Sequence, residues 1–237
     1  MESYETCAGS PLVIHWKLTK HLFFTWEVDS DALQSVIHES VDLVEVRPGI
    51  ALLSTGVLQY EAGQFSPSSP PFIELVTVAH VQPDLSVKMP VPRFTFQSIS
   101  VYSDSPEFVE QEGRLLFTPT ELVPSLTAVY ADDGLGVDVS DARGPILTLR
   151  NTQPEVSFSA TEFHGQHFTV KDGLQIGIWQ WDGVRFEHMK RGDAGKLHPH
   201  PHFKSIDLKR VRSCYRQMMG KPAVACNERF YAMKRFA

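Results

Sequence analysis

The sequence predicts an α+β protein dominated by antiparallel strands, with roughly ten strands and about three helices. Many short runs rich in β-branched and aromatic residues end at Gly, Pro, Asp or Asn. The clearest of these runs extends from Pro70 to Val81. Few stretches carry apolar residues at helical spacing. With 42% hydrophobic residues, the 237-residue chain is expected to form one domain, residues 1–237, around a sizeable core.

The first part of the chain predicts strands around one short helix. Asp29 or Ser30 is expected to cap this helix, because a short polar side chain can accept from the amide groups of the first turn. The turn Arg47-Pro48-Gly49 is expected to join two antiparallel strands. The expected elements are a segment at Leu12–Ile14, a strand at His21–Val28, a helix at Ala32–Glu39, and strands at Val41–Val46 and Ile50–Tyr60.

The middle of the chain contains the best-defined strand and the best-defined helix. Phe65–Pro71 is too rich in proline and serine for either and is predicted to be a rim loop. Phe72–Val81 and Phe94–Tyr102 read as strands. A helix is expected from Ser105 to Leu116, because a capping serine or aspartate within Ser103-Asp104-Ser105 precedes a proline and an acid in the first turn.

The last part predicts several strands, one basic helix and a final segment of either type. The helix is expected at Ile206–Met219, where Ile206, Val211, Tyr215 and Met218 fall on one side. The expected strands are Leu126–Tyr130, Gly136–Val139, Ile146–Leu149, Val156–Ala160, His167–Val170 and Leu174–Trp181, followed by a helix or strand at Asn227–Phe236.

Charge and composition exclude several classes of protein. The net charge of −6 argues against nucleic acid as the main partner, although the chain is basic after Lys190. This basic end is best explained as the complement of an acidic body. No apolar stretch of about 18 residues is present, so no membrane span is expected. An acidic N-terminus and three cysteines without CxxC spacing, Cys7, Cys214 and Cys226, favour free thiols in the cytoplasm.

Glu74 is the residue that most needs explanation. In a strand, Phe72, Glu74 and Val76 share one face, so the carboxylate points in the same direction as apolar side chains. Burial would disfavour its charged form and suit it to act as a general acid or base. The structural alternative is that Glu74 pairs with Arg93, Arg114 or a tyrosine and orients a wall.

The order of these motifs resembles the acetoacetate decarboxylase superfamily. The resemblance rests on the segments Asp29–Ile37, Phe72–Val76 and Ser105–Glu107, and covers about Leu22–Leu122. It implies a cone-like, largely antiparallel β-barrel with helices at its ends. It also implies a dry internal cavity for a small keto acid or related molecule.

The chain departs from that family at the catalytic lysine. Family members that decarboxylate carry a lysine after the helix that opens at Pro106, and the matching stretch here is Phe117–Leu122. Neither Thr120 nor Glu121 can form a Schiff base, so a lysine-dependent decarboxylase is not expected. The family arginine would fall near Thr19 or Lys20, and a family glutamate near Leu53 or Ser54, and neither is matched.

Other residues complete the predicted site. Glu121 and Arg93 are the further catalytic candidates beside Glu74, and Lys88 is a weaker candidate for a relocated amine that is more simply explained as a surface lysine. Aromatic, apolar and basic side chains are expected to contact the ligand. The ligand-binding candidates are Phe72, Val76, Tyr102, Arg114, Trp179 and Trp181.

The segment His198-Pro199-His200-Pro201-His202 places three imidazoles at alternate positions. Neutral imidazole binds zinc or copper, so His198, His200 and His202 are weak metal candidates, with His164 or His167 as a further ligand. An exposed loop without metal is the simpler explanation, and no cofactor is expected.

These observations favour a pocket protein that acts on a carbonyl-bearing organic acid or secondary metabolite by acid-base chemistry without a Schiff base. If it is an enzyme, it would be a lyase, isomerase or hydrolase. The first alternative is a non-catalytic ligand-binding or protein-interaction module on the same fold, and the second is a histidine-rich metal-dependent enzyme. The expected partner is a small organic ligand, with no nucleic acid and no membrane, and a homo-oligomer is left open.

Overall fold

The computed structural model describes residues 2–6, 12–38, 41–83, 85–86, 94–115, 120–131, 136–150, 154–170, 174–189, 195–220 and 224–235. Side chains are described within residues 16–38, 41–82, 95–113, 120–131, 136–150 and 195–212. No helix in this part of the chain is long and apolar enough to cross a membrane.

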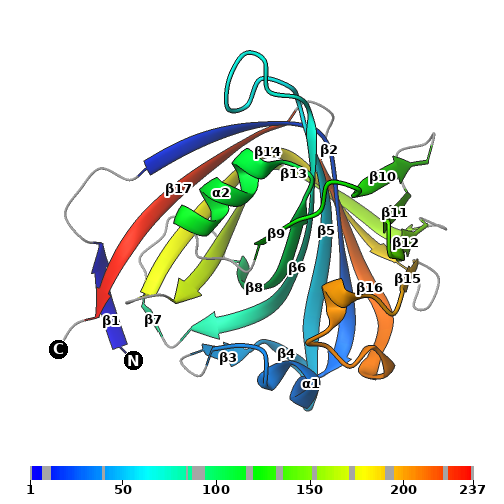
Figure 1. Ribbon diagram of the computed structural model, residues 1–237. Helices are drawn as coiled ribbons and strands as arrows, with labels where there is room; N and C mark the ends of the chain where they lie inside the picture. Colours follow the sequence, from blue (N-terminus) through cyan, green and yellow to red (C-terminus); the bar gives the residue numbers. More distant parts are fainter. Residues whose placement is uncertain are drawn as a thin grey trace.

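Eight strands form a strongly curled sheet whose pairing closes into a ring (Figure 1). The long strand β2 closes it, because β2 pairs with β5 along one edge and with β16 and β17 along the other. Neighbours are antiparallel except β8 and β13, which are parallel. The ring consists of β5 (Ile50–Tyr60), β6 (Phe72–Pro83), β8 (Phe94–Ser103), β13 (Pro154–Val170), β14 (Leu174–Met189), β16 (Val211–Gly220), β17 (Val224–Arg235) and β2 (Leu12–Asp29).

Shorter elements surround this ring. Short strands extend its edges, namely β1 (Glu2–Thr6), β3 (Val41–Leu43), β4 (Glu45–Arg47), β7 (Leu85–Ser86) and β9 (Thr120–Leu122). A separate four-stranded sheet contains β10 (Thr127–Tyr130), β11 (Val137–Asp141), β12 (Gly144–Leu149) and β15 (Gly195–Leu197). The helices are α1 (Ser30–Gln34) and α2 (Pro106–Leu115), with 3-10 turns η1 (Pro201–Phe203) and η2 (Leu208–Arg210).

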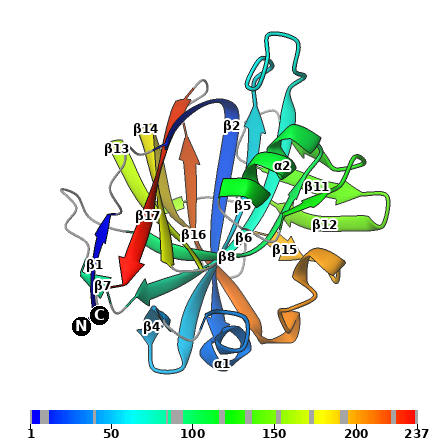
Figure 2. The same ribbon diagram turned by 60° about the vertical axis from the view of Figure 1, so that its left-hand side comes forward.

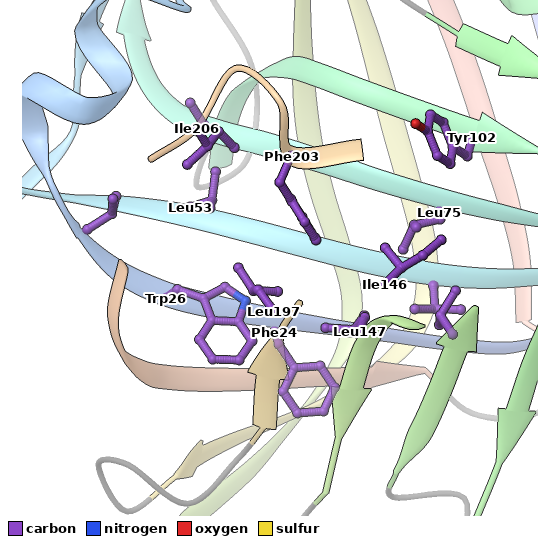
Figure 3. Close-up of a cluster of buried hydrophobic side chains, with 14 of the residues drawn as sticks. Phe24, Trp26, Leu53, Leu75, Tyr102, Ile146, Leu147, Leu197, Phe203 and Ile206 are labelled. Atoms are coloured by element: carbon purple, nitrogen blue, oxygen red, sulfur yellow. The ribbon is translucent and has the colours of Figure 1, made fainter. Parts of the chain in front are cut away.

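The four-stranded sheet packs on the outside of the ring (Figure 2). Apolar side chains of β11, β12 and β15 meet the outward side chains of β2, β5 and β6, together with Phe203 and Ile206 (Figure 3). Phe24, Leu53, Leu75, Ile146 and Leu147 in this layer are fully buried. The opposite face of the same ring strands is the inner face.

The strand-dominated class is confirmed, and several elements agree closely with the sequence. The central strand is β6, and the turn at Pro48-Gly49 joins β4 to β5, with Gly49 at a φ of 76°. Helix α2 begins at Pro106, where the Ser105 hydroxyl accepts a hydrogen bond from the Phe108 amide at 3.2 Å. Seventeen strands and two α-helices in the described residues replace the expected ten and three.

The predicted basic helix at Ile206–Met219 is wrong. The segment forms the η2 turn and then strand β16, which is hydrogen-bonded to β2 on one side and to β14 on the other. Two neighbouring strands satisfy its backbone groups, so tertiary pairing overrides the helical spacing of its apolar residues. The segment from Asn227 lies in β17 and is a strand.

The predicted cap of the first helix is also wrong. Asp29 is at the N-cap position of α1, but its side chain makes no capping hydrogen bond. Its carboxylate instead accepts from Arg212 Nε at 2.7 Å and pairs with Arg210 at 3.5 Å. Arg210 also pairs with Asp31. The arginines after η1 therefore complement acids near α1, as expected for the basic end of the chain.

Candidate functional site

The inner face of the ring is arranged in rows that cross β2, β5, β6 and β8. The pairing register aligns inward residues into five levels. From the α2 end, the rows are Leu18–Tyr60–Phe72, His21–Leu58–Glu74–Ser103, Phe23–Gly56–Val76–Val101 and Thr25–Ser54–Val78–Ser98, and the last level consists of the pairs Glu27–Leu52 and His80–Phe96. The middle row is apolar, so it separates two polar zones.

The first polar zone is centred on Glu74, which lies on the inner face as predicted. Glu74 is 6% exposed, and Tyr60 Oη donates a hydrogen bond of 2.6 Å to its Oε2. The carboxyl oxygen Oε1 has no hydrogen-bond partner among the described residues. The pairing with a tyrosine, weighed from the sequence as a structural explanation, is therefore present, and it occupies only one of the two carboxyl oxygens.

Aromatic rings enclose this end of the inner face. The Tyr60 ring stacks on Phe72 with centroids 4.3 Å apart, and Trp16 approaches Tyr60 edge-on at 5.2 Å. Phe108 of α2 packs on Phe72 at 5.2 Å, which places the helix over this end of the ring. Glu74 therefore sits in an environment of low dielectric constant.

This environment changes the acidity of Glu74. Burial raises its pKa to about 7 from the ordinary 4.5, although the hydrogen bond from Tyr60 lowers it. At neutral pH the group therefore exists in both protonation states. A carboxyl group of this kind can donate a proton to a nearby carbonyl oxygen or remove one from a neighbouring carbon.

The raised pKa predicts a pH-dependent stability. The folded protein keeps the Glu74 proton up to about pH 7, whereas the unfolded chain releases it near pH 4.5. The contribution of protonated Glu74 to the free energy of unfolding is therefore complete below pH 4.5. It is lost as the pH rises through 7, and the free energy of unfolding decreases by about 3 kcal/mol. We expect Glu74→Gln to abolish this decrease and Tyr60→Phe to raise the pKa further.

Urea unfolding of the parent and both variants at about pH 5 and about pH 8 measures this effect. A nuclear magnetic resonance titration of the Glu74 carboxyl carbon gives the two pKa values directly. A decrease of the same size in the Glu74→Gln variant would assign it to another group.

The second polar zone is a chain of three side chains from three adjacent strands. The Ser54 hydroxyl lies 2.7 Å from His80 Nε2 and 2.8 Å from the Thr25 hydroxyl. All three residues are at least 94% buried. At the same end of the ring, the buried Glu27 pairs with Arg47 at 2.9 Å, and the Arg47 side chain is 44% exposed.

The sequence did not single out Tyr60, Ser54 or His80. Tyr60 lies across the β5–β6 hairpin from Phe72, so an assumed hairpin register would have placed it beside Glu74. Ser54 and His80 are 26 residues apart and meet diagonally across two strands. Neither a motif nor local spacing indicates such a contact.

The three candidate metal ligands are separated by the fold and bind different partners on the outer side of the ring. His198 Nε2 lies 3.1 Å from the Thr148 hydroxyl, and His200 Nε2 lies 3.1 Å from Asp141 Oδ1. His202 Nε2 lies 2.9 Å from the Thr77 hydroxyl, and its Nδ1 is 3.2 Å from Ser100. The described residues contain no group of three metal-ligating side chains.

Tyr102 and Glu121 also lie on the outer side of the ring, next to the four-stranded sheet, so the expectation that they share the Glu74 site is wrong. Tyr102 pairs with Leu75, not with Glu74, and therefore points outward, where its ring is 4.5 Å from that of His202. Glu121 is exposed and accepts from Arg143 Nη1 at 3.2 Å. By contrast, Phe72 and Val76 lie on the inner face with Glu74, as predicted.

No lysine side chain described by the structure reaches the inner face. All five that it describes are exposed, namely Lys17, Lys20, Lys196, Lys204 and Lys209. Several predicted site residues are outside the described part: Cys7, Lys88 and Arg93 altogether, and the side chains of Arg114, His164, His167, Trp179, Trp181, Cys214 and Cys226.

No protein-family model and no curated protein sequence matches the chain. Solved structures do match its fold. A structure of acetoacetate decarboxylase is 12% identical with a TM-score of 0.59 and covers 98% of this chain and 91% of its own. The enduracididine biosynthesis enzyme MppR complexed with pyruvate is 11% identical with a TM-score of 0.56, covering 98% and 93%.

An acetoacetate decarboxylase-like enzyme from Sphingomonas wittichii RW1 is 12% identical with a TM-score of 0.54, covering 95% of this chain and 92% of its own. The chain therefore has the acetoacetate decarboxylase fold over nearly its whole length. The resemblance noted in the sequence is confirmed at this level.

Proposed function

We propose that the protein is an enzyme that binds a small carbonyl-bearing organic acid or related metabolite against the inner face of its ring. In this proposal Glu74 transfers a proton to or from the ligand. The observation that carries it is the buried carboxyl group with a pKa of about 7 and one oxygen without a partner among the described residues. The pyruvate complex of the similarly folded MppR supports the class of ligand.

The geometry suggests how the proton transfer would be organised. Tyr60 holds Oε2, so the ligand would meet Oε1. When protonated, Glu74 donates to the carbonyl oxygen and stabilises the negative charge that develops as an enolate forms. When ionised, it removes a proton from the carbon beside the carbonyl. Both roles belong to lyase or isomerase chemistry and need no amine.

The exchange of carbon-bound protons tests the proposed role of Glu74. Pyruvate or acetoacetate is incubated with the protein in deuterium oxide, and deuterium incorporation beside the carbonyl is followed by nuclear magnetic resonance. We expect exchange above the buffer rate, with an inflection near pH 7, and a decrease of about 100-fold in Glu74→Gln. Glu107→Gln, on the exposed side of α2, is the matched control and keeps the parent rate.

Two results would count against this proposal. If Glu74→Gln retains a copurifying small molecule and the exchange rate of the parent, then the carboxyl group is structural and a ligand-binding module is the better description. If borohydride traps a stable adduct between the keto acid and the protein, then a lysine outside the described residues performs the chemistry through an iminium.

A further inference from the structure

The second polar zone contains a reactive arrangement that the proposed function does not use. We propose that Ser54 and His80 form a nucleophilic serine site that accepts the acyl group of a small ester. The Ser54 hydroxyl lies 2.7 Å from His80 Nε2, within the distance at which an imidazole takes the proton of an attacking serine. This requires the tautomer that carries its proton on Nδ1.

Thr25, the third residue of this hydrogen-bonded group, stabilises the attacking oxygen of Ser54. The Thr25 hydroxyl is 2.8 Å from Ser54 Oγ and can donate to it while Ser54 donates to His80. A hydroxyl donor stabilises negative charge on Oγ as the serine proton leaves. The direction of donation therefore runs from Thr25 through Ser54 to His80.

The surroundings favour an apolar acyl group. Leu52, Val78 and Phe96 share the two rows that hold Ser54 and His80, and each is at most 6% exposed. The rows adjoin Glu27, whose partner Arg47 is partly exposed, so this end of the inner face lies near solvent. An ester entering from this end meets Ser54 before the apolar middle row of Phe23 and Val76.

The chemistry balances without a cofactor. Ser54 Oγ bonds to the acyl carbon while its proton passes to His80 Nε2. The bond between the acyl carbon and the ester oxygen then breaks, and His80 returns the proton to the departing alcohol. Water, activated in the same way, releases the acid and restores the serine.

A small alkyl fluorophosphonate tests the site, because it reacts with activated serines: a bond forms between Oγ and phosphorus, fluoride leaves, and His80 takes the proton. Tryptic mass spectrometry of the full chain locates the adduct. We expect labelling at Ser54, none at this position in Ser54→Ala, and a rate about 100-fold lower in His80→Gln. Ser98→Ala is the matched control, because Ser98 is a buried serine in the same row, and this variant is labelled like the parent.

Absence of a Ser54 adduct in the folded parent overturns the proposal. The hydrogen bonds among Thr25, Ser54 and His80 would then serve only as a polar cross-link between strands. Labelling at an unchanged rate in His80→Gln also overturns it, because the serine would then react without its base. Circular dichroism melting of each variant confirms that a lost label does not reflect a lost fold. The assay does not involve Glu74, so either proposal can fail while the other stands.

Discussion

Acidification from pH 6.5 to pH 3 is expected to lower the free energy of unfolding by about 5 kcal/mol through one side chain, His202. Burial, with smaller effects of the neighbouring His200 and Arg143, lowers its pKa to about 3, and Asp141 opposes this shift. The unfolded chain binds a proton at this residue below pH 6.5, but the folded protein does not. The contribution is therefore complete above pH 6.5 and is lost as the pH falls toward 3.

The contacts of His202 explain why it stays neutral. Its two ring nitrogens lie between the hydroxyls of Thr77 and Ser100, and its backbone amide donates to His200 Nδ1 at 3.1 Å. One hydroxyl can donate to a neutral imidazole and the other can accept from it. A protonated ring would need two acceptors and would place a charge in the outer core.

Urea unfolding at about pH 7 and about pH 4 in the parent and in His202→Gln measures this contribution. The glutamine keeps hydrogen-bonding capacity but cannot be protonated, so its stability should fall less on acidification. His198→Gln is the control, because His198 is only partly buried and should keep most of the parent's decrease. Equal acid sensitivity in the parent and His202→Gln would refute the assignment.

Glu74 and His202 act in opposite directions over part of the pH range. Between pH 4.5 and 6.5 the first contribution falls as the pH rises, and the second falls as the pH decreases. His21, whose pKa burial lowers to about 4, acts in the same direction as His202. Single variants are therefore required, because the parent profile is the sum of these opposing terms.

Phe24→Ala is expected to lower the free energy of unfolding by about 4 kcal/mol. Phe24 is completely buried between the ring and the outer sheet, in the cluster with Leu147 and Leu197 (Figure 3). Truncation removes one of the largest fully buried side chains from the cluster shared by these two layers and leaves a cavity behind. Since whole domains are stable by only about 5–15 kcal/mol, this variant should be close to unfolding.

Thermal and urea unfolding measure the effect, with Val129→Ala as the control. Val129 is 67% exposed on β10 in the same outer sheet, so its truncation should change stability by less than about 0.5 kcal/mol. A small effect of Phe24→Ala would mean that the outer sheet contributes little to the stability of the ring.

The local parts of this fold were predictable from sequence, and the long-range parts were not. The run from Phe72 and the Ser105-Pro106 helix start carry their own signals in alternation and capping, so β6 and α2 agree closely. Segments that looked like separate short strands join into the long β13, because pairing with β14 carries the strand across Gly165. The helix predicted for Ile206–Met219 was wrong for the same reason, since the neighbours of this segment in β2 are about 190 residues away in the sequence.

The candidate site follows the same division. Alternation along one strand placed Phe72, Glu74 and Val76 together, and the structure confirms this face. It also shows that Tyr102 belongs to the other face, because the inward position opposite Glu74 is Ser103. The Tyr60 and Ser54–His80 contacts depend on register between strands, which a single sequence does not specify.

The way β2 closes the ring has a consequence for synthesis in the cell. Its partners β16 and β17 follow about 180 to 220 residues later in the sequence, so the second edge of β2 is paired only after those residues have left the ribosome. Contacts of such high sequence separation form slowly. Until then one edge of β2 is unpaired, and an unpaired strand edge is a site at which a nascent chain can associate with another copy of itself.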